Sequence, residues 1–343
     1  MKQTIYSIQL LRALAAFLVL LLHTFYKETV YSNGIFTGFH FGHIGVDIFF
    51  IVSGFIMLHT IKENTHPLDF LLKRFIRIYP IYWLTSIVAL IGYIVVPHLV
   101  NSGREADLIA SLFLLPTQVG YLNPNAWTLS FELLFYFILF VVLLISFRFR
   151  VVLSTLIVLV LGSYGLLAKP EGNWSSFIFN SILFEFVLGF VVYGIYCNFV
   201  RLNRYLLLLR ILSVILFSIL WNIESELRFV HFGSLAFCIC IFCLSFEPLM
   251  QTKRNSLLMK LGDSSYSLYL THAFVLSGAG FLFSKVNFIV DNSYIFVFLL
   301  LSISLIVGYY SFKFIEQPLT RYILRYYKVV SVPYVHKVST GKK

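Results

Sequence analysis

Charged residues are scarce in this sequence. Only 12% of the 343 residues are Asp, Glu, Lys or Arg, whereas 59% are hydrophobic and the mean hydropathy is +0.87. A soluble domain has about 25% charged residues, which cover its surface. The deficit excludes an ordinary soluble protein, and most of the surface of this chain is expected to face lipid.

Cysteine and glycine are also few. The sequence has four Cys and 19 Gly, which excludes a disulfide scaffold and a collagen-like chain, while its 37 Phe exclude a disordered one. Cys238, Cys240 and Cys243 sit in one apolar run with no His or carboxylate at the spacing of metal ligands. We interpret them as small buried hydrophobic residues and expect neither a metal nor a resident cofactor.

Long apolar runs dominate the sequence instead. An α-helix needs about 20 apolar residues to cross a hydrocarbon core of roughly 30 Å. The predicted spans lie near 8–26, 42–61, 75–97, 127–146, 151–168, 177–197, 205–223, 229–246, 264–284 and 292–315. The sequence therefore predicts an all-α polytopic membrane helix bundle with about ten transmembrane helices. We expect one transmembrane domain over 1–320 and a basic cytoplasmic tail over 321–343.

Acidic residues are outnumbered, with 15 Asp and Glu against 26 Lys and Arg. When the spans alternate in direction, 20 of the basic residues fall on the side of the N-terminus, five fall on the other side, and Lys313 lies within the last span. This bias is the positive-inside pattern, so both termini are predicted to be cytoplasmic. The basic residues are interpreted as topology signals, and no nucleic-acid partner is expected. The outward segment 105–116 is predicted to form an amphipathic helix on the membrane surface.

Ionisable side chains inside the spans are the candidates for function, because a charge in hydrocarbon is costly. Arg12 and His23 lie about 16 Å apart along one helix at a rise of ~1.5 Å per residue, on roughly the same face. Asp47 and Glu132 enter from the predicted outer side, at a depth close to that of His23. We predict that His23, Asp47 and Glu132 meet in one layer, with structural hydrogen bonds as the alternative for each.

A second group lies at the cytoplasmic level. Arg74 and Arg77 are about one helical turn apart at the start of the third span, beside the depth of Arg12. Three guanidinium groups form a good anion clamp, because each can donate two charge-assisted hydrogen bonds to a phosphate. The alternative is that they are positive-inside anchors.

Other polar residues are expected to support the wall of a pocket. Tyr269 and His272 share one face of the ninth span, and Ser53 and Glu185 lie in the second and sixth spans. Helix packing and structural partners are the alternatives for these residues. Glu316, at the inner end of the last span, is expected to cap that end or pair with cytoplasmic arginines.

These residues occur in motifs that resemble those of one family. The motifs are Arg12 with His23, GVDIFFIVSGF (Gly45 to Phe55), RFIRIYPIYW (Arg74 to Trp83), WTLSFELLFY (Trp127 to Tyr136), YSLYLTH (Tyr266 to His272) and IEQP (Ile315 to Pro318). Together they resemble the acyltransferase 3 family of integral membrane acyltransferases over nearly the whole chain. The opening SIQLLRALAA (Ser7 to Ala16) is similar to the branch that acetylates bacterial exopolysaccharide and O-antigen sugars.

The resemblance implies a ten-helix enzyme of the bacterial cytoplasmic (inner) membrane. Its co-substrate would be acyl-CoA, with acetyl-CoA expected, and its acceptor a hydroxyl of a cell-surface polysaccharide or of a lipid-linked precursor. Arg12, Arg74 and Arg77 would bind the nucleotide phosphates, and His23 would act as the general base on the acceptor hydroxyl. The sequence indicates no particular oligomeric state.

The remaining roles stay open among several residues. Asp47 or Glu132 would fix the tautomer of the base, and Tyr269, Ser53 or His272 would donate a hydrogen bond to the oxyanion. A covalent acyl-enzyme is an alternative to direct transfer. A transporter or flippase for a lipid-linked sugar or a small solute is the competing class of protein. It is disfavoured because no inverted repeat is detectable and the acidic groups share one depth.

Overall fold

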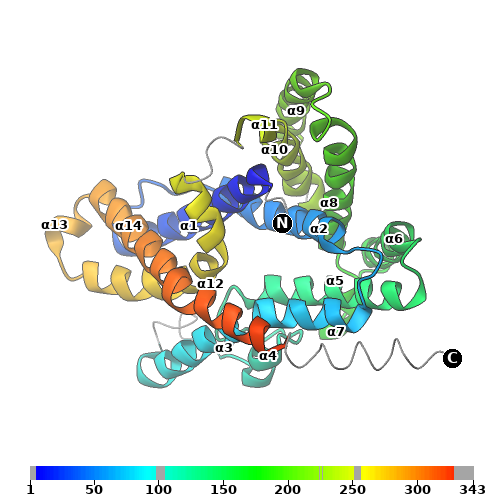
Figure 1. The fold of residues 1–343 in the computed structure, drawn as a ribbon. Helices are drawn as coiled ribbons and strands as arrows, with labels where there is room; N and C mark the ends of the chain where they lie inside the picture. The colour runs from blue at the N-terminus through cyan, green and yellow to red at the C-terminus, as the bar shows by residue number, and fades with distance from the viewer. Residues whose placement is uncertain (1–4, 98–104, 224, 226, 251–255, 328–343) are drawn as a thin grey trace.

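The computed structural model of the protein describes residues 5–97, 105–223, 225, 227–250 and 256–327. These residues are mostly helical, with no strand among them (Figure 1). The helices are α1 (Tyr6–Tyr31), α2 (Ile44–Thr60), α3 (Pro67–Val95), α4 (Leu108–Phe113), α5 (Ala126–Ile145), α6 (Arg150–Ala168), α7 (Asn173–Ile178), α8 (Phe184–Ile195), α9 (Leu206–Trp221), α10 (Ser234–Leu244), α11 (Glu247–Met250), α12 (Leu257–Phe283), α13 (Asn287–Val290) and α14 (Ser293–Ser311). Short 3-10 or π turns adjoin them at η1 (Phe41–His43), η4 (Ser181–Leu183), η5 (Tyr196–Val200), η6 (Phe229–Gly233) and η7 (Phe312–Glu316).

Eight of the described helical segments are long and apolar enough to cross a membrane. Two further apolar segments, Leu206–Trp221 and Phe229–Leu244, are shorter, and together the ten match the predicted spans in order. Large apolar side chains such as Leu167 and Phe298 are exposed on the outside of the bundle, as lipid contact requires. The prediction of an all-α, multi-span membrane protein is confirmed.

The helix directions agree with alternating spans. The start of α12 lies against the start of α1, where Gly262 contacts the backbone of Gln9, and His272 contacts His23 farther along both helices. The first and ninth of the ten apolar helices are therefore parallel. Below, the end of the bundle at which α1 and α12 begin is called the inner end, and the opposite end the outer end.

Two groups of helices flank α1 and α2. Figure 1 shows α12 and α14 beside α1, while α8, α9 and α10 lie at the other side of α2. The backbones of α2 and α8 approach closely where Gly54 faces Gly189: a Cβ atom on Gly54 would lie 2.1 Å from the carbonyl oxygen of Phe186. Only glycine allows this contact, which holds α2 firmly in the centre of the bundle.

A carboxylate from a distant segment binds the first turn of α1. Glu247 in α11 accepts hydrogen bonds from the backbone N–H groups of Tyr6 (3.1 Å) and Ser7 (2.6 Å). These N–H groups have no partner inside the helix, and a negative charge there also complements the helix dipole. The contact fixes the inner end of the helix that carries Arg12 and His23.

The segment expected on the membrane surface lies elsewhere. Its helix α4 packs at the middle of α3, where the hydroxyl of Tyr79 donates to the carbonyl of Phe113 (3.0 Å) and the indole N–H of Trp83 donates to that of Leu112 (2.9 Å). Non-helical backbone is tolerated at this depth only when protein groups satisfy it. The expectation of a surface helix was wrong about position, although α4 is amphipathic with an exposed apolar face. Residues 98–104 of this outer loop lie outside the described residues.

The described helix that contains α14 continues to Tyr327. There the hydroxyl of Tyr327 donates to Asp69 Oδ1 in α3 at 2.8 Å. The first residues of the predicted tail are therefore helical and packed against α3, and residues 328–343 of that tail lie outside the described residues.

Candidate active site

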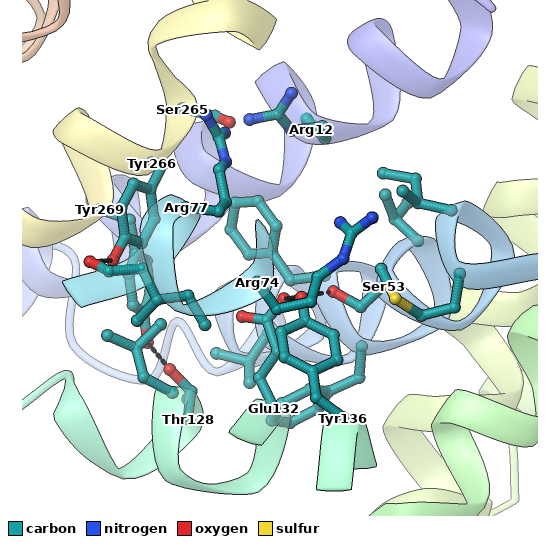
Figure 2. A pocket seen from close by; sticks show the side chains of 18 of the residues that line it. Arg12, Ser53, Arg74, Arg77, Thr128, Glu132, Tyr136, Ser265, Tyr266 and Tyr269 are labelled. Carbon is teal, nitrogen blue, oxygen red and sulfur yellow. Dashed lines mark hydrogen bonds between the residues drawn. The ribbon is translucent and has the colours of Figure 1, made fainter. Parts of the chain in front are cut away.

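A cavity of about 410 Å³ lies among α1, α2, α3, α5 and α12, and we call it the arginine cavity. Its polar lining residues are Gln9, Arg12, Ser53, Arg74, Arg77, Thr128, Glu132, Tyr136, Asp263, Ser265, Tyr266 and Tyr269. Figure 2 shows the side chains of Arg12 and Arg77 near Ser265, with Arg74 above Ser53 and Glu132. The three arginines predicted to form one cluster therefore line one cavity.

The inner part of this cavity is formed by Arg12 and Arg77. Arg12 donates to Gln9 Oε1 at 3.0 Å, one turn earlier on α1. Arg77 forms an ion pair with the buried carboxylate of Glu316 at 2.9 Å, so the expected pairing of Glu316 with an inner arginine is confirmed. The side chain of Arg77 remains 37% exposed, which leaves part of its guanidinium group free to bind an anion.

Arg74 lies on another side of the cavity, beside the last residue of α2. Its guanidinium group donates to Thr60 Oγ1 at 3.1 Å and lies over the rings of Phe70 and Tyr136, 5.5 and 5.8 Å from their centroids. Its buried Nε and the hydroxyl of Ser265 have no hydrogen-bond partner in the described part of the chain. Unpartnered donors in a cavity are costly, so a ligand that accepts hydrogen bonds would satisfy them.

Glu132 lies in the same cavity and not beside His23. Ser53 Oγ donates to its Oε1 at 3.0 Å, and the hydroxyl of Tyr136, one turn along α5, donates to the same oxygen. The prediction that Glu132 meets His23 was therefore wrong, because its helix face points inward toward the arginines. Ser53 also belongs to this cavity and not to the surroundings of His23.

Tyr269 lines the outer part of the arginine cavity. Its hydroxyl is 2.8 Å from Thr128 Oγ1, and its backbone carbonyl accepts from the side chain of Asn125 at 3.0 Å. The neighbouring carbonyl of Leu270 accepts from Asn123 at 3.3 Å. The two asparagines thus attach the segment before α5 to the middle of α12 and hold Tyr269 in place.

A second cavity, of about 570 Å³, lies toward the outer end, and we call it the histidine cavity. Its lining residues are Leu22, His23, Phe25, Tyr26, Lys27, Thr29, Phe36, Thr37, Gly38, Phe39, His40, His43, Pro124, Ala273, Leu276 and Ser277. Hydroxyl, imidazole and aromatic groups of this kind suit a polar ligand that has apolar faces. His23 and Arg12 therefore serve different cavities from the same helix.

His23 makes a direct contact with His272. Nδ1 of His23 is 3.2 Å from Nε2 of His272, and the ring centroids are 5.1 Å apart. His272 is almost fully buried, with 1% exposure, while His23 lines the histidine cavity. The expectation that Asp47 or Glu132 would be the partner of His23 is replaced by this pair.

A layer of rings separates the two cavities. The rings of Phe49 and Tyr269, which both line the arginine cavity, have centroids 5.7 Å apart. The ring of His272 follows at 5.8 Å from Tyr269, and His23 lies beyond it. One layer of aromatic rings therefore lies between the arginines and His23.

Asp47 belongs to a group of buried polar residues that is separate from both cavities. It forms an ion pair with Arg228 at 2.8 Å, and Arg228 also donates to the carbonyl oxygen of His43 at 3.3 Å. Glu185 is buried next to this pair, and neither oxygen of its carboxylate has a hydrogen-bond partner in the described part of the chain. Asp47 and Glu185 line neither cavity, so the predicted contact of Asp47 with His23 and the pocket position of Glu185 were both wrong.

Several residues of the two cavities escaped the analysis of the sequence. Gln9 and Asp263 carry no helical pattern that distinguishes them from a polar helix end. Outside the cavities, Arg228, the ion-pair partner of Asp47, was counted only as one of the few outer basic residues. The basic and aromatic composition of 23–43, with three histidines and Lys27, was a readable signal for the histidine cavity.

Comparison with known proteins agrees with this architecture. Residues 5–313 match the profile of the acyltransferase 3 family, described as an acyltransferase domain. The chain is 30% identical over 256 residues to the exopolysaccharide production protein ExoZ of Rhizobium meliloti (strain 1021), covering 70% of this chain and 79% of that protein. It is also 30% identical over 103 residues to the acyltransferase MdmB of Streptomyces mycarofaciens, covering 28% and 27%. No solved structure matches. The chain therefore belongs to the acyltransferase 3 family, and it is a multi-span membrane acyltransferase.

Proposed function

We propose that this enzyme transfers an acetyl group from cytoplasmic acetyl-CoA to a hydroxyl of a cell-surface polysaccharide, or of its lipid-linked precursor, in the bacterial inner membrane. The observation that carries the proposal is the arrangement of the two cavities. One is lined by three arginines, the other contains an accessible histidine, and a single aromatic layer lies between them. The similarity to an exopolysaccharide production protein supports the choice of acceptor.

The arginine cavity is the proposed donor site. The phosphates of CoA carry several negative charges, and Arg12, Arg74 and Arg77 present permanently charged groups at the end where the basic residues of the chain are concentrated. The pantetheine arm has two amides and would extend past Ser53 and Glu132, whose oxygens can bond to amide groups. In this proposal the thioester would lie at the aromatic layer of Phe49 and Tyr269.

The histidine cavity is the proposed acceptor site. Its aromatic side chains, among them Phe36 and Phe39, can stack on the apolar faces of a sugar ring, and its histidines can bond to hydroxyl groups. His23 would remove the proton from the acceptor hydroxyl while the oxygen attacks the thioester carbon. The C–O bond forms, the C–S bond breaks, and the proton ends on the sulfur of CoA.

The aromatic layer must open for this reaction, because His23 does not line the arginine cavity. Movement of the Phe49 or Tyr269 ring would let the thioester pass toward His23. In the closed arrangement the layer keeps water of the outer side away from a bound thioester, which protects it from hydrolysis.

The test compares the surface polysaccharide of the host with and without this gene. We expect the deletion to remove one acetyl mass per repeat unit, measured by mass spectrometry, and a plasmid copy to restore it. An unchanged mass, together with an accumulated lipid-linked sugar on the inner leaflet, would instead support the flippase alternative.

A further inference from the structure

We infer that His272 is the positioning residue that fixes the proton on Nδ1 of His23 and leaves Nε2 of His23 as the base. The inference rests on the proposed function for its chemical consequence. Its structural part concerns only which ring nitrogen carries a proton, and this can be measured without any substrate.

The carbonyl of Leu268 determines the tautomer of His272. Nδ1 of His272 is 3.1 Å from this carbonyl oxygen, one helical turn earlier on α12. A carbonyl oxygen can only accept a hydrogen bond, so Nδ1 of His272 must carry the proton. A neutral imidazole has a single N–H, and Nε2 of His272 is consequently a bare acceptor.

The tautomer of His23 follows from that of His272. Nε2 of His272 lies 3.2 Å from Nδ1 of His23, and a hydrogen bond between two nitrogens needs one proton. Since Nε2 of His272 has none in the neutral ring, Nδ1 of His23 is the donor. Its own Nε2 is then unprotonated, and no hydrogen bond engages it within the described residues.

The surroundings of the pair support this assignment. His272 is buried against Tyr269 and has no contact with either cavity, so its ring has no route to bind substrate. His23 shares its cavity with Lys27, His40 and His43, and among the described residues no carboxylate lines that cavity. In many enzymes a carboxylate orients the catalytic base, whereas here a neutral imidazole does so.

The chemical consequence is a base with a fixed direction. Nε2 of His23 takes the proton of the acceptor hydroxyl as the new C–O bond forms, and it returns that proton to the sulfur when the C–S bond breaks. Nδ1 keeps its proton and its bond to His272 throughout. Without His272 the ring could place its proton on Nε2 instead, and that tautomer has its lone pair on Nδ1 and none on Nε2, where the hydroxyl would bind.

The test uses two variants and a control. His272→Leu removes the acceptor, whereas His272→Gln places an amide oxygen near the position of Nε2. The control is His231→Leu, since Nδ1 of His231 also bonds to a backbone carbonyl, that of Ile223 at 3.0 Å, but its ring lines neither cavity. Each variant is purified in detergent, and its folding is checked by size exclusion and thermal unfolding.

The expected result has two parts. In ¹⁵N-histidine-labelled protein at mildly alkaline pH, His23, assigned by comparison with His23→Ala, is protonated on Nδ1 and bare on Nε2, and His272→Leu mixes the two tautomers. In hosts and in vitro, His272→Leu lowers kcat by roughly 10- to 100-fold with His272→Gln between it and wild type. The affinity for acetyl-CoA stays unchanged in both, as does all activity in His231→Leu.

Two results would overturn the inference. One is a wild-type His23 that carries its proton on Nε2, which remains decisive even if the Leu variant does not fold. The other is a folded His272→Leu protein with wild-type kcat. If wild type shows the expected tautomer but acylates nothing, the proposed function fails while the assignment of the protons stands.

Discussion

His23 lies where the proposed chemistry must take place, and its substitution is the first prediction at the scale of the residue. His23→Ala removes the only imidazole that both lines the histidine cavity and contacts His272 among the described residues. We expect polysaccharide acetylation to fall at least about 100-fold, the usual contribution of a general base. The protein should still insert and fold, because His23 fills no closed core position.

The control for this variant is His66→Ala, which changes an exposed histidine at the start of α3. It should leave acetylation unchanged. Near wild-type acetylation in a membrane that contains only the His23→Ala protein would show that another group is the base.

The arginines are tested by a change that keeps their charge. Lysine preserves the positive-inside signal but loses the planar fork that can bond twice to a phosphate. Each of Arg12→Lys, Arg74→Lys and Arg77→Lys is expected to weaken acetyl-CoA binding by about tenfold, the equivalent of one charge-assisted hydrogen bond. Calorimetry on the detergent-solubilised protein measures this directly.

Arg148→Lys serves as the matched control, because Arg148 is exposed and lines neither cavity. If all three cavity variants bind acetyl-CoA as wild type does, the arginines are topology anchors and the donor site lies elsewhere.

For the three arginines, the depth along the helix axis could be predicted from the sequence. The direction in which a buried side chain points could not be predicted. A rise of ~1.5 Å per residue placed Arg12, Arg74 and Arg77 at one level, and the structure brings them together. The same reasoning placed His23, Asp47 and Glu132 at one level, yet Glu132 lies in the arginine cavity, across the aromatic layer from His23, and Asp47 pairs with Arg228. An apolar helix that is buried on most sides has too weak a periodicity to indicate which neighbour each face meets.

At the scale of the element, the inner end of α1 depends on Glu247. Replacing this carboxylate by an amide in Glu247→Gln removes the charge that complements the helix dipole and one of the two acceptors for Tyr6 and Ser7. We expect a loss of about 1–2 kcal/mol of stability, seen as a lower thermal midpoint in detergent.

The comparison is Glu63→Gln, which alters an exposed acidic residue between α2 and α3. An equal midpoint for Glu247→Gln and Glu63→Gln would mean that the cap contributes nothing measurable. Because Arg12 follows this first turn, we also expect the Glu247 variant to bind acetyl-CoA less tightly.

The segment 105–125 shows what hydropathy leaves undetermined in an element. The sequence shows that α4 is amphipathic. A helix on the membrane surface and a helix packed at mid-depth have the same pattern of apolar and polar residues, because one face contacts lipid in both cases. The position is decided by tertiary contacts: Asn123 and Asn125 bond to carbonyls of α12, and aromatic donors of α3 bond to carbonyls of α4. These partners are far apart in sequence, so no local rule predicts them.

For the whole molecule, the number and order of the helices follow from composition and the length of apolar runs. The parallel packing of α1 with α12 agrees with the alternation that the positive-inside pattern predicts. The positive-inside pattern does not predict that the interior holds two cavities with an aromatic layer between them. This division makes transfer across the membrane the central claim about the intact protein.

The most direct test uses purified protein in sealed vesicles of one orientation, with acetyl-CoA carrying a labelled acetyl group. The donor is supplied only on the side of the inner end, and saccharide precursor from the host only on the opposite side. The account predicts labelled acetyl on the acceptor, and no label when His23→Ala replaces wild type. Label only on an acceptor placed with the donor, or passage of saccharide without cleavage of the thioester, would contradict it.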